Sequence, residues 1–169
     1  MSIADSLLPE FDHEMGVTRT LLEIVPEAKA SWKPHQKSFS LGDLSAHLAN
    51  IPTWAGVTLS GTEFDVNPPG GAADHTPRTF GSAKDNVKTF DDNVKAAREA
   101  IAKASDADFM TMWTLKNGGK ETMSMPRVGV VRSFVLNHLI HHRGQLSVYL
   151  RLQDVPLPGI YGPSADTPM

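Results

Sequence analysis

Four segments of the chain carry apolar residues at alternating spacings of three and four, which predicts amphipathic helices. They cover about residues 3–25, 40–61, 79–104 and 126–153. The third has the most regular pattern, an unbroken heptad alternation of Phe80, Ala83, Val87, Phe90, Val94, Ala97, Ile101 and Ala104. Because each helix has one apolar face to bury, the pattern predicts an all-α four-helix bundle.

Prolines and glycines predict where these helices bend or end. Pro26 ends the first helix, because proline cannot donate the next helical hydrogen bond. Pro52 lies inside the pattern of the second helix and predicts a kink there, and Gly61 ends that helix. The Pro- and Gly-rich run 67–71 predicts a loop before the third helix.

A different pattern separates the third and fourth helices. Methionines alternate with polar residues at Met110 and Met112, and again at Met123 and Met125, around an Asn-Gly-Gly turn signal at 117–119. This alternation predicts a short β-hairpin or an extended excursion from the bundle.

Composition narrows the class of protein. A chain of 169 residues predicts one domain, residues 1–169. The net charge of -3, with no block of Lys and Arg, argues against nucleic acid or an anionic membrane as a partner. The N-terminus resembles no leader and no apolar run approaches a membrane helix, so we expect a cytoplasmic protein. The absence of cysteine excludes thiolate ligands and a cysteine nucleophile.

The apolar face of the fourth predicted helix changes character along its length. It begins with three valines and continues with His138 and His142. These histidines are one turn apart and project to the same side, so they can share one metal ion. His47 lies on the apolar face of the second helix. Since a bundle can bring that face against the fourth helix, the three histidines are candidate ligands for one divalent metal ion.

The alternative is that these histidines are buried and satisfied by ordinary hydrogen bonds. Buried polar groups need partners, and one ion would satisfy all three. His141 lies about 100° around the helix from His142, so we expect it beside the ligands or at an interface rather than among them. Gln145 and Tyr149 follow on the same face and either line a pocket or pack in the core. His13, His35 and His75 read as surface residues.

Several stretches resemble the DinB-like (DinB/YfiT) family. Residues 137–146, Asn-His-Leu-Ile-His-His-Arg-Gly-Gln-Leu, resemble its signature. Trp32-Lys33-Pro34 with Ser38, and then residues 41–48, resemble its second-helix motif, and residues 154–162 resemble its tail. The resemblance implies a four-helix bundle with a long crossover connection. It also implies a metal site of one histidine on the second helix and two on the fourth, which are His47, His138 and His142 here.

The expected activity follows from the ligand set and the resemblance. Three neutral imidazoles leave a coordination position open for water or substrate. Members of the resembled family include thiol-dependent S-transferases and a maleylpyruvate isomerase that uses a thiol cofactor. We therefore expect a metal-dependent thiol S-transferase that uses a small-molecule substrate and a low-molecular-weight thiol. The alternatives are a metal-dependent hydrolase and a non-enzymatic bundle that binds a metal or small ligand. Zinc or nickel is the expected metal, with iron as an alternative.

A second apolar stripe on the fourth helix bears on oligomeric state. It consists of Leu136, Leu139, Leu146 and Leu150, interrupted by arginines. The stripe either packs against a second helix of the same bundle or forms a contact between two copies of the chain. Because the resembled family often forms dimers, we expect a homodimer with an isologous interface.

Overall fold

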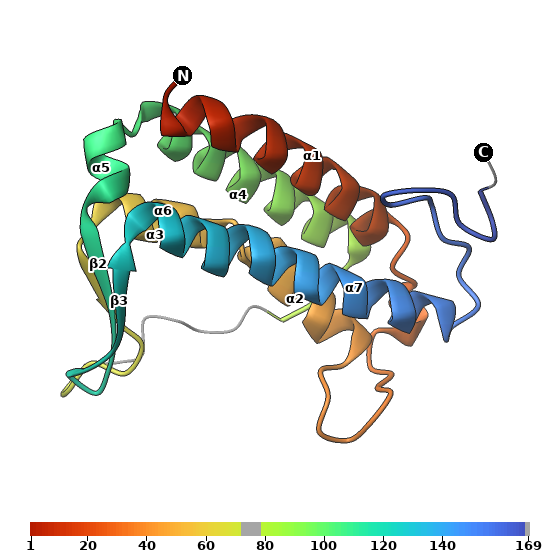
Figure 1. Cartoon of the computed structure of the whole chain (residues 1–169). Helices are drawn as coiled ribbons and strands as arrows, with labels where there is room; N and C mark the ends of the chain where they lie inside the picture. The colour runs from red at the N-terminus through yellow and green to blue at the C-terminus, as the bar shows by residue number, and fades with distance from the viewer. Residues whose placement is uncertain (72–78, 168–169) are drawn as a thin grey trace.

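The computed structural model describes residues 1–71 and 79–167, and His75 lies outside that part of the chain. All four predicted helical segments are confirmed, two of them in several pieces (Figure 1). The helices are α1 (Ile3–Glu23), η1 (Glu27–Lys29), α2 (Leu41–Asn50), α3 (Thr53–Ser60), α4 (Ala83–Lys103), α5 (Asp106–Met110), α6 (Arg127–Val130), η2 (Val131–Asn137) and α7 (His138–Arg151).

The second predicted helix is divided at Pro52 into α2 and α3. Proline has no N–H to continue the ladder, so the predicted kink becomes a break between two helices. α2 begins where the Ser40 hydroxyl accepts a hydrogen bond from the N–H of Asp43, at 3.0 Å. α3 ends at Gly61, as the sequence predicts.

The fourth predicted helix contains a π-helical segment that periodicity did not reveal. η2 lies between α6 and α7, and the N–H of His138 donates to the carbonyl of Ser133, five residues earlier. A π-helical turn inserts an extra residue and shifts the phase of the helix beyond it. The apolar face of α6 and the histidine face of α7 are therefore not related by uninterrupted α-helical geometry.

The all-α prediction is wrong in one respect, because the structure contains a three-stranded sheet. The hairpin is confirmed as β2 (Met112–Asn117) and β3 (Lys120–Pro126), antiparallel, with Gly118 and Gly119 at φ +63° and +77°. Such positive φ values suit glycine in a two-residue hairpin turn. The third strand, β1 (Glu63–Asp65), pairs in parallel with β2. Its partner is about fifty residues away along the chain, so local alternation could not indicate it.

Two ion pairs join α1 to α4 and show that these helices run in opposite directions. Arg19 pairs with Asp91 at 2.8 Å, and Arg98 pairs with Asp12 at 2.8 Å. Because residues later in α1 meet residues earlier in α4, the two helices are antiparallel, and Figure 1 shows them side by side.

α2 and α4 run in the same direction. Asn86 donates to the carbonyl of Ser45 at 3.2 Å, and Asn93 donates to the carbonyl of Ala49 at 2.9 Å. α2 and α4 are therefore parallel, whereas short loops join antiparallel helices. The long crossover that the family resemblance implies stays a prediction.

One apolar core lies between these helices, with contributions from α1, α2, α4 and α7. Leu136, Leu139, Leu146 and Leu150 are fully buried in it. The second stripe of the fourth predicted helix is thus covered within the chain, and the dimer prediction now rests on the family resemblance alone. In the described residues no helix is both long and apolar enough to span a membrane.

Candidate metal centre

Three imidazole rings converge between α2 and α7. His47 comes from α2, and His138 and His142 come from the first two turns of α7. The Nε2 atom of His138 lies 3.2 Å from that of His47 and 2.9 Å from that of His142. A ligand atom from each ring lies within 4.8 Å of the other two, and no carboxylate joins this group in the described residues. The structure therefore brings together the three histidines that the sequence predicted as ligands.

These separations fit a shared metal ion. Zinc binds imidazole nitrogen at about 2.0–2.1 Å, so two ligands at tetrahedral angles are about 3.3 Å apart. The two short Nε2 separations, 2.9 and 3.2 Å, are close to that value. Two of the three pairs of nitrogens are thus already near the spacing that a tetrahedral ion requires.

Gln145 determines which nitrogen of His142 carries the proton. Its Oε1 lies 2.7 Å from Nδ1 of His142, and its Nε2 lies 3.2 Å from Nε2 of His141. In this orientation the amide nitrogen donates to His141, and the amide oxygen accepts from His142. Nδ1 of His142 is therefore protonated, and its Nε2 presents a lone pair to the other two rings.

The π-helical segment has the same effect on His138. In η2 the backbone N–H of His138 bonds to Ser133 and Val135, not to Phe134. The carbonyl of Phe134 instead accepts a hydrogen bond from the His138 side chain. Because Nε2 faces the other two histidines, the donor is Nδ1. Two Nε2 lone pairs, on His138 and His142, thus face each other at 2.9 Å, an arrangement that a bound cation stabilises.

The surroundings also keep these rings neutral. Burial lowers the pKa of His138 below its ordinary value of 6.5, and the nearby His142 lowers it further. Burial also lowers the pKa of His142, and the side chain of Gln145 partly opposes that shift. Neutral imidazole is the form that binds metal, so both shifts extend the pH range in which the lone pairs are available.

His141 is exposed and lies outside the group of three. Its ring is 4.9 Å from that of His142, centre to centre, and contacts Gln145. His141 therefore lies beside the group of three histidines and not within it, and that it does not bind the metal stays a prediction. His13 and His35 are also exposed, as predicted.

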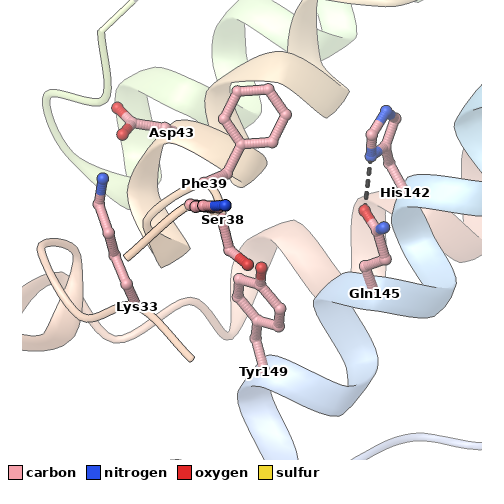
Figure 2. A pocket seen from close by; sticks show the side chains of 8 residues that line it. Lys33, Ser38, Phe39, Asp43, His142, Gln145 and Tyr149 are labelled. Atoms are coloured by element: carbon pink, nitrogen blue, oxygen red, sulfur yellow. Dashed lines mark hydrogen bonds between the residues drawn. The ribbon is translucent and has the colours of Figure 1, made fainter. Parts of the chain in front are cut away.

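A cleft of about 270 Å³ opens beside His142, one of the three histidines (Figure 2). Its lining residues are Lys33, Lys37, Ser38, Phe39, Asp43, His142, Gln145 and Tyr149. Phe39 is 47% exposed, and its ring stacks on His47 at 5.6 Å. The exposed Phe39 side chain therefore lies between solvent and the candidate metal site.

Sequence reasoning found the three imidazoles but missed most of what surrounds them. Gln145 and Tyr149 were expected either in a pocket or in the core, and they line the cleft. Phe39 and Lys37 carried no signal in the helical periodicity, because they lie in the loop before α2. Lys33 and Ser38 did belong to a stretch of family resemblance, which was the one clue to this part of the site.

Comparison with known proteins supports the resemblance. The family model of the DinB superfamily matches residues 10–146. The uncharacterised protein YrdA of Bacillus subtilis (strain 168) is 25% identical over 166 residues, which cover 96% of this chain and 90% of that protein.

Two solved structures share the fold. A DinB-like protein from Bacillus cereus ATCC 10987 superposes with a TM-score of 0.69 at 23% identity, covering 95% of this chain and 98% of that one. The DinB-like protein YjoA from Bacillus subtilis gives a TM-score of 0.64 at 16% identity, covering 97% and 99%. At these identities the likeness concerns the fold alone.

Proposed function

This chain belongs to the DinB superfamily, and from that premise we propose that it binds a divalent metal ion and acts as a metal-dependent thiol S-transferase. The observation that carries the proposal is the group of three inward-facing Nε2 atoms beside a cleft. Zinc or nickel is the proposed ion and iron the alternative, because imidazole suits all three.

The ligand set favours a catalytic site over a structural one. Structural zinc sites are closed by four protein ligands, whereas catalytic sites keep a position open. His47, His138 and His142 supply three ligands, and no carboxylate completes the group in the described part of the chain. A divalent ion held there would lower the pKa of a thiol or water that reaches the open position.

This chain's own residues would then position the reactants. Gln145 and the Phe134 carbonyl hold the rings of His142 and His138 with Nε2 inward. Phe39 and Tyr149 provide the walls against which a cosubstrate can lie. In the reaction class we propose, the thiol loses its proton to solvent, its sulfur forms a bond to carbon, and the leaving group departs with its electron pair. Because the chain has no cysteine, the thiol must come from outside.

We extend the proposal to the architecture. The single apolar core supports one domain, residues 1–169, in which α1, α2–α3, α4 and α6–α7 are the four helices of a bundle. The metal centre lies between the second and fourth of these helices.

Metal analysis of protein purified without an affinity tag tests the metal site. We expect about one ion per chain, little or none in His138→Ala, and nearly full loading in His141→Ala. The His141 variant is the matched control, because it removes an adjacent imidazole that is not in the group of three. Equal loss of metal in the two variants would refute our choice of ligands.

A reaction screen tests the enzyme class. Purified protein, with and without metal, is incubated with common bacterial thiols and with halogenated or epoxide electrophiles. We expect metal-dependent consumption of thiol and electrophile together. Ester or amide hydrolysis without any thiol conjugation would favour the hydrolase alternative, and no metal-dependent turnover of either kind would favour a binding protein.

A further inference from the structure

Two charged residues of the cleft, Lys33 and Asp43, lie across the Phe39 side chain from His142. Figure 2 shows Lys33 and Asp43 on one side of Phe39, and His142 and Gln145 on the other. A ligand that fills the cleft therefore has one end at His142 and the other beside Lys33 and Asp43.

The two lysines of the cleft form no ion pair within residues 1–71 and 79–167. None of the ion pairs in the described residues includes Lys33, Lys37 or Asp43. Two positive charges and one negative charge give the lining of the cleft a net positive charge. The whole chain is negative, at -3, so the cleft differs in sign from the molecule as a whole. Such local charge attracts anionic ligands.

The loop that carries the lysines is fixed to α2 rather than free in solvent. The N–H of Leu41 donates to the carbonyl of Trp32 at 2.9 Å, and that of Gly42 donates to the carbonyl of Ala30 at 2.8 Å. A Cβ atom at position 42 would lie 3.0 Å from Cβ of Phe80 and 3.1 Å from Cβ of Ala30, so glycine makes this approach possible without displacing either neighbour. These two hydrogen bonds fix both ends of the loop segment 33–38, which carries Lys33 and Lys37.

The aromatic walls leave apolar surface for the middle of a ligand. Tyr149 is held edge-on by Trp32, with ring centres 5.5 Å apart. Phe39 stacks on the ring of His47 and makes an edge contact with the ring of His142. The sequence singled out three residues of this loop without giving them a role. Lys33 and Ser38 line the cleft, and Trp32 supports Tyr149 in its wall.

We propose that this cleft binds a thiol cosubstrate with a carboxylate at the end opposite its sulfur. Lys33 and Lys37 bind the carboxylate, the chain of the ligand lies between Phe39 and Tyr149, and the sulfur reaches the ion beside His142. The inference rests on the proposed metal centre and adds the chemical class of the thiol. If Asp43 bound the end of the ligand instead, the thiol would carry a cationic group there. The experiment distinguishes a carboxylate-bearing thiol from a cationic one.

The experiment uses full-length protein loaded with Co²⁺, whose visible absorption changes when a thiolate binds. It is titrated with straight-chain mercaptocarboxylic acids, and with mercaptoalcohols and mercaptoamines of the same chain lengths. At the length that spans the cleft, the acid should bind about tenfold more tightly than the alcohol, as expected for two partly exposed charge pairs. The amine should bind no better than the alcohol.

Two double variants test whether the cleft lysines cause the preference for the acid over the alcohol. K33Q/K37Q should lose most of the preference for the acid over the alcohol. K95Q/K120Q removes the same charge from exposed positions outside the cleft and should retain it. Circular dichroism and cobalt content, measured on each variant, establish that it is folded and loaded.

The outcomes separate this inference from the proposed function. Normal cobalt uptake without a preference for the acid, or equal losses in the two double variants, would overturn the carboxylate site and leave the metal centre standing. Tighter binding of the amine would assign the cleft to Asp43 instead and also overturn the inference. Failure of the unmodified chain to take up cobalt would overturn both.

Discussion

Gln145 contacts two histidines with the two ends of one amide group, at 2.7 Å to His142 and 3.2 Å to His141. Only the first contact bears on a metal, because only His142 belongs to the group of three. Groups that orient a ligand imidazole in this way commonly change metal affinity by about tenfold to a hundredfold when they are removed.

We therefore expect Gln145→Leu to weaken metal binding by about tenfold or more. Gln145→Glu keeps an oxygen acceptor for Nδ1 of His142 and should bind metal nearly as well as the unmodified chain. Competition against a chromophoric chelator measures each affinity. If the leucine variant matched the unmodified chain, Gln145 would have no orienting role.

The lowered pKa values of His138 and His142 predict a pH dependence in the metal-free protein. In the unfolded chain these rings have ordinary pKa values near 6.5. As pH falls through that value, the unfolded state takes up protons that the folded state does not, so the free energy of unfolding decreases. The decrease continues until pH reaches the lower pKa values of the folded state.

Urea denaturation of metal-free protein across this pH range measures the effect. Replacing both rings, in His138→Gln/His142→Gln, should flatten the dependence below pH 6.5, because the groups responsible are gone. The remaining histidines are the same in both proteins and serve as the internal control. Parallel curves for the two proteins would contradict the assignment.

At the scale of elements, a buried ion pair joins α1 to α7, and an exposed tyrosine of the C-terminal tail contacts both of its members. Arg143 pairs with Glu14 at 2.6 Å, and their side chains are 2% and 8% exposed. The hydroxyl of Tyr161 donates to Glu14 at 2.8 Å and accepts a hydrogen bond from Arg143. Arg143 interrupts the leucine stripe of the fourth predicted helix, and this pairing is what allows a charge to lie there.

We expect Arg143→Met to lower the free energy of unfolding by roughly 3–5 kcal/mol, because it leaves the charge of the buried Glu14 carboxylate without its cationic partner. Adding Glu14→Gln should restore part of that loss. The control is Arg132→Met, which breaks the ion pair of Arg132 with Glu10. This pair joins η2 to α1, and both of its side chains are partly exposed. It should cost about 1 kcal/mol or less. Denaturant unfolding that gave equal losses for the two arginines would contradict the role of the buried pair.

At the scale of the whole molecule, metal should add stability without being required for folding. The core contains the apolar faces of α1 and α4, which carry none of the three histidines. Binding to the folded state alone contributes ~2.7 kcal/mol at about a hundredfold excess over Kd. Chelated protein should therefore stay helical by circular dichroism and melt at a lower temperature, while His138→Ala should melt at the same temperature with or without chelator. Complete unfolding on chelation would show that the metal is structural.

The homodimer remains a prediction of family resemblance, since the leucine stripe that first suggested it is buried within the chain. Sedimentation at micromolar concentration tests it. A species of twice the chain mass is expected, and a monomer of 18.4 kDa would refute the dimer.

Local sequence determined the features that depend on short-range geometry. The spacing of apolar residues located the helices, Pro52 located the break between α2 and α3, and Gly118-Gly119 located the hairpin turn. The four-residue spacing of His138 and His142 placed both rings on one side of a helix. Each of these follows from helical periodicity or from backbone dihedral angles, which are properties of a few neighbouring residues.

Tertiary structure decided the rest, because it depends on contacts between residues far apart in the chain. The pairing of β1 with β2 spans about fifty residues. The approach of His47 to His138 joins two helices, and the apolar face of α2 alone could not distinguish a ligand from a satisfied core histidine. The cleft exists only where a loop, α2 and α7 meet, so Lys37 and Phe39 acquire a place beside the histidines through packing and not through any pattern along the chain.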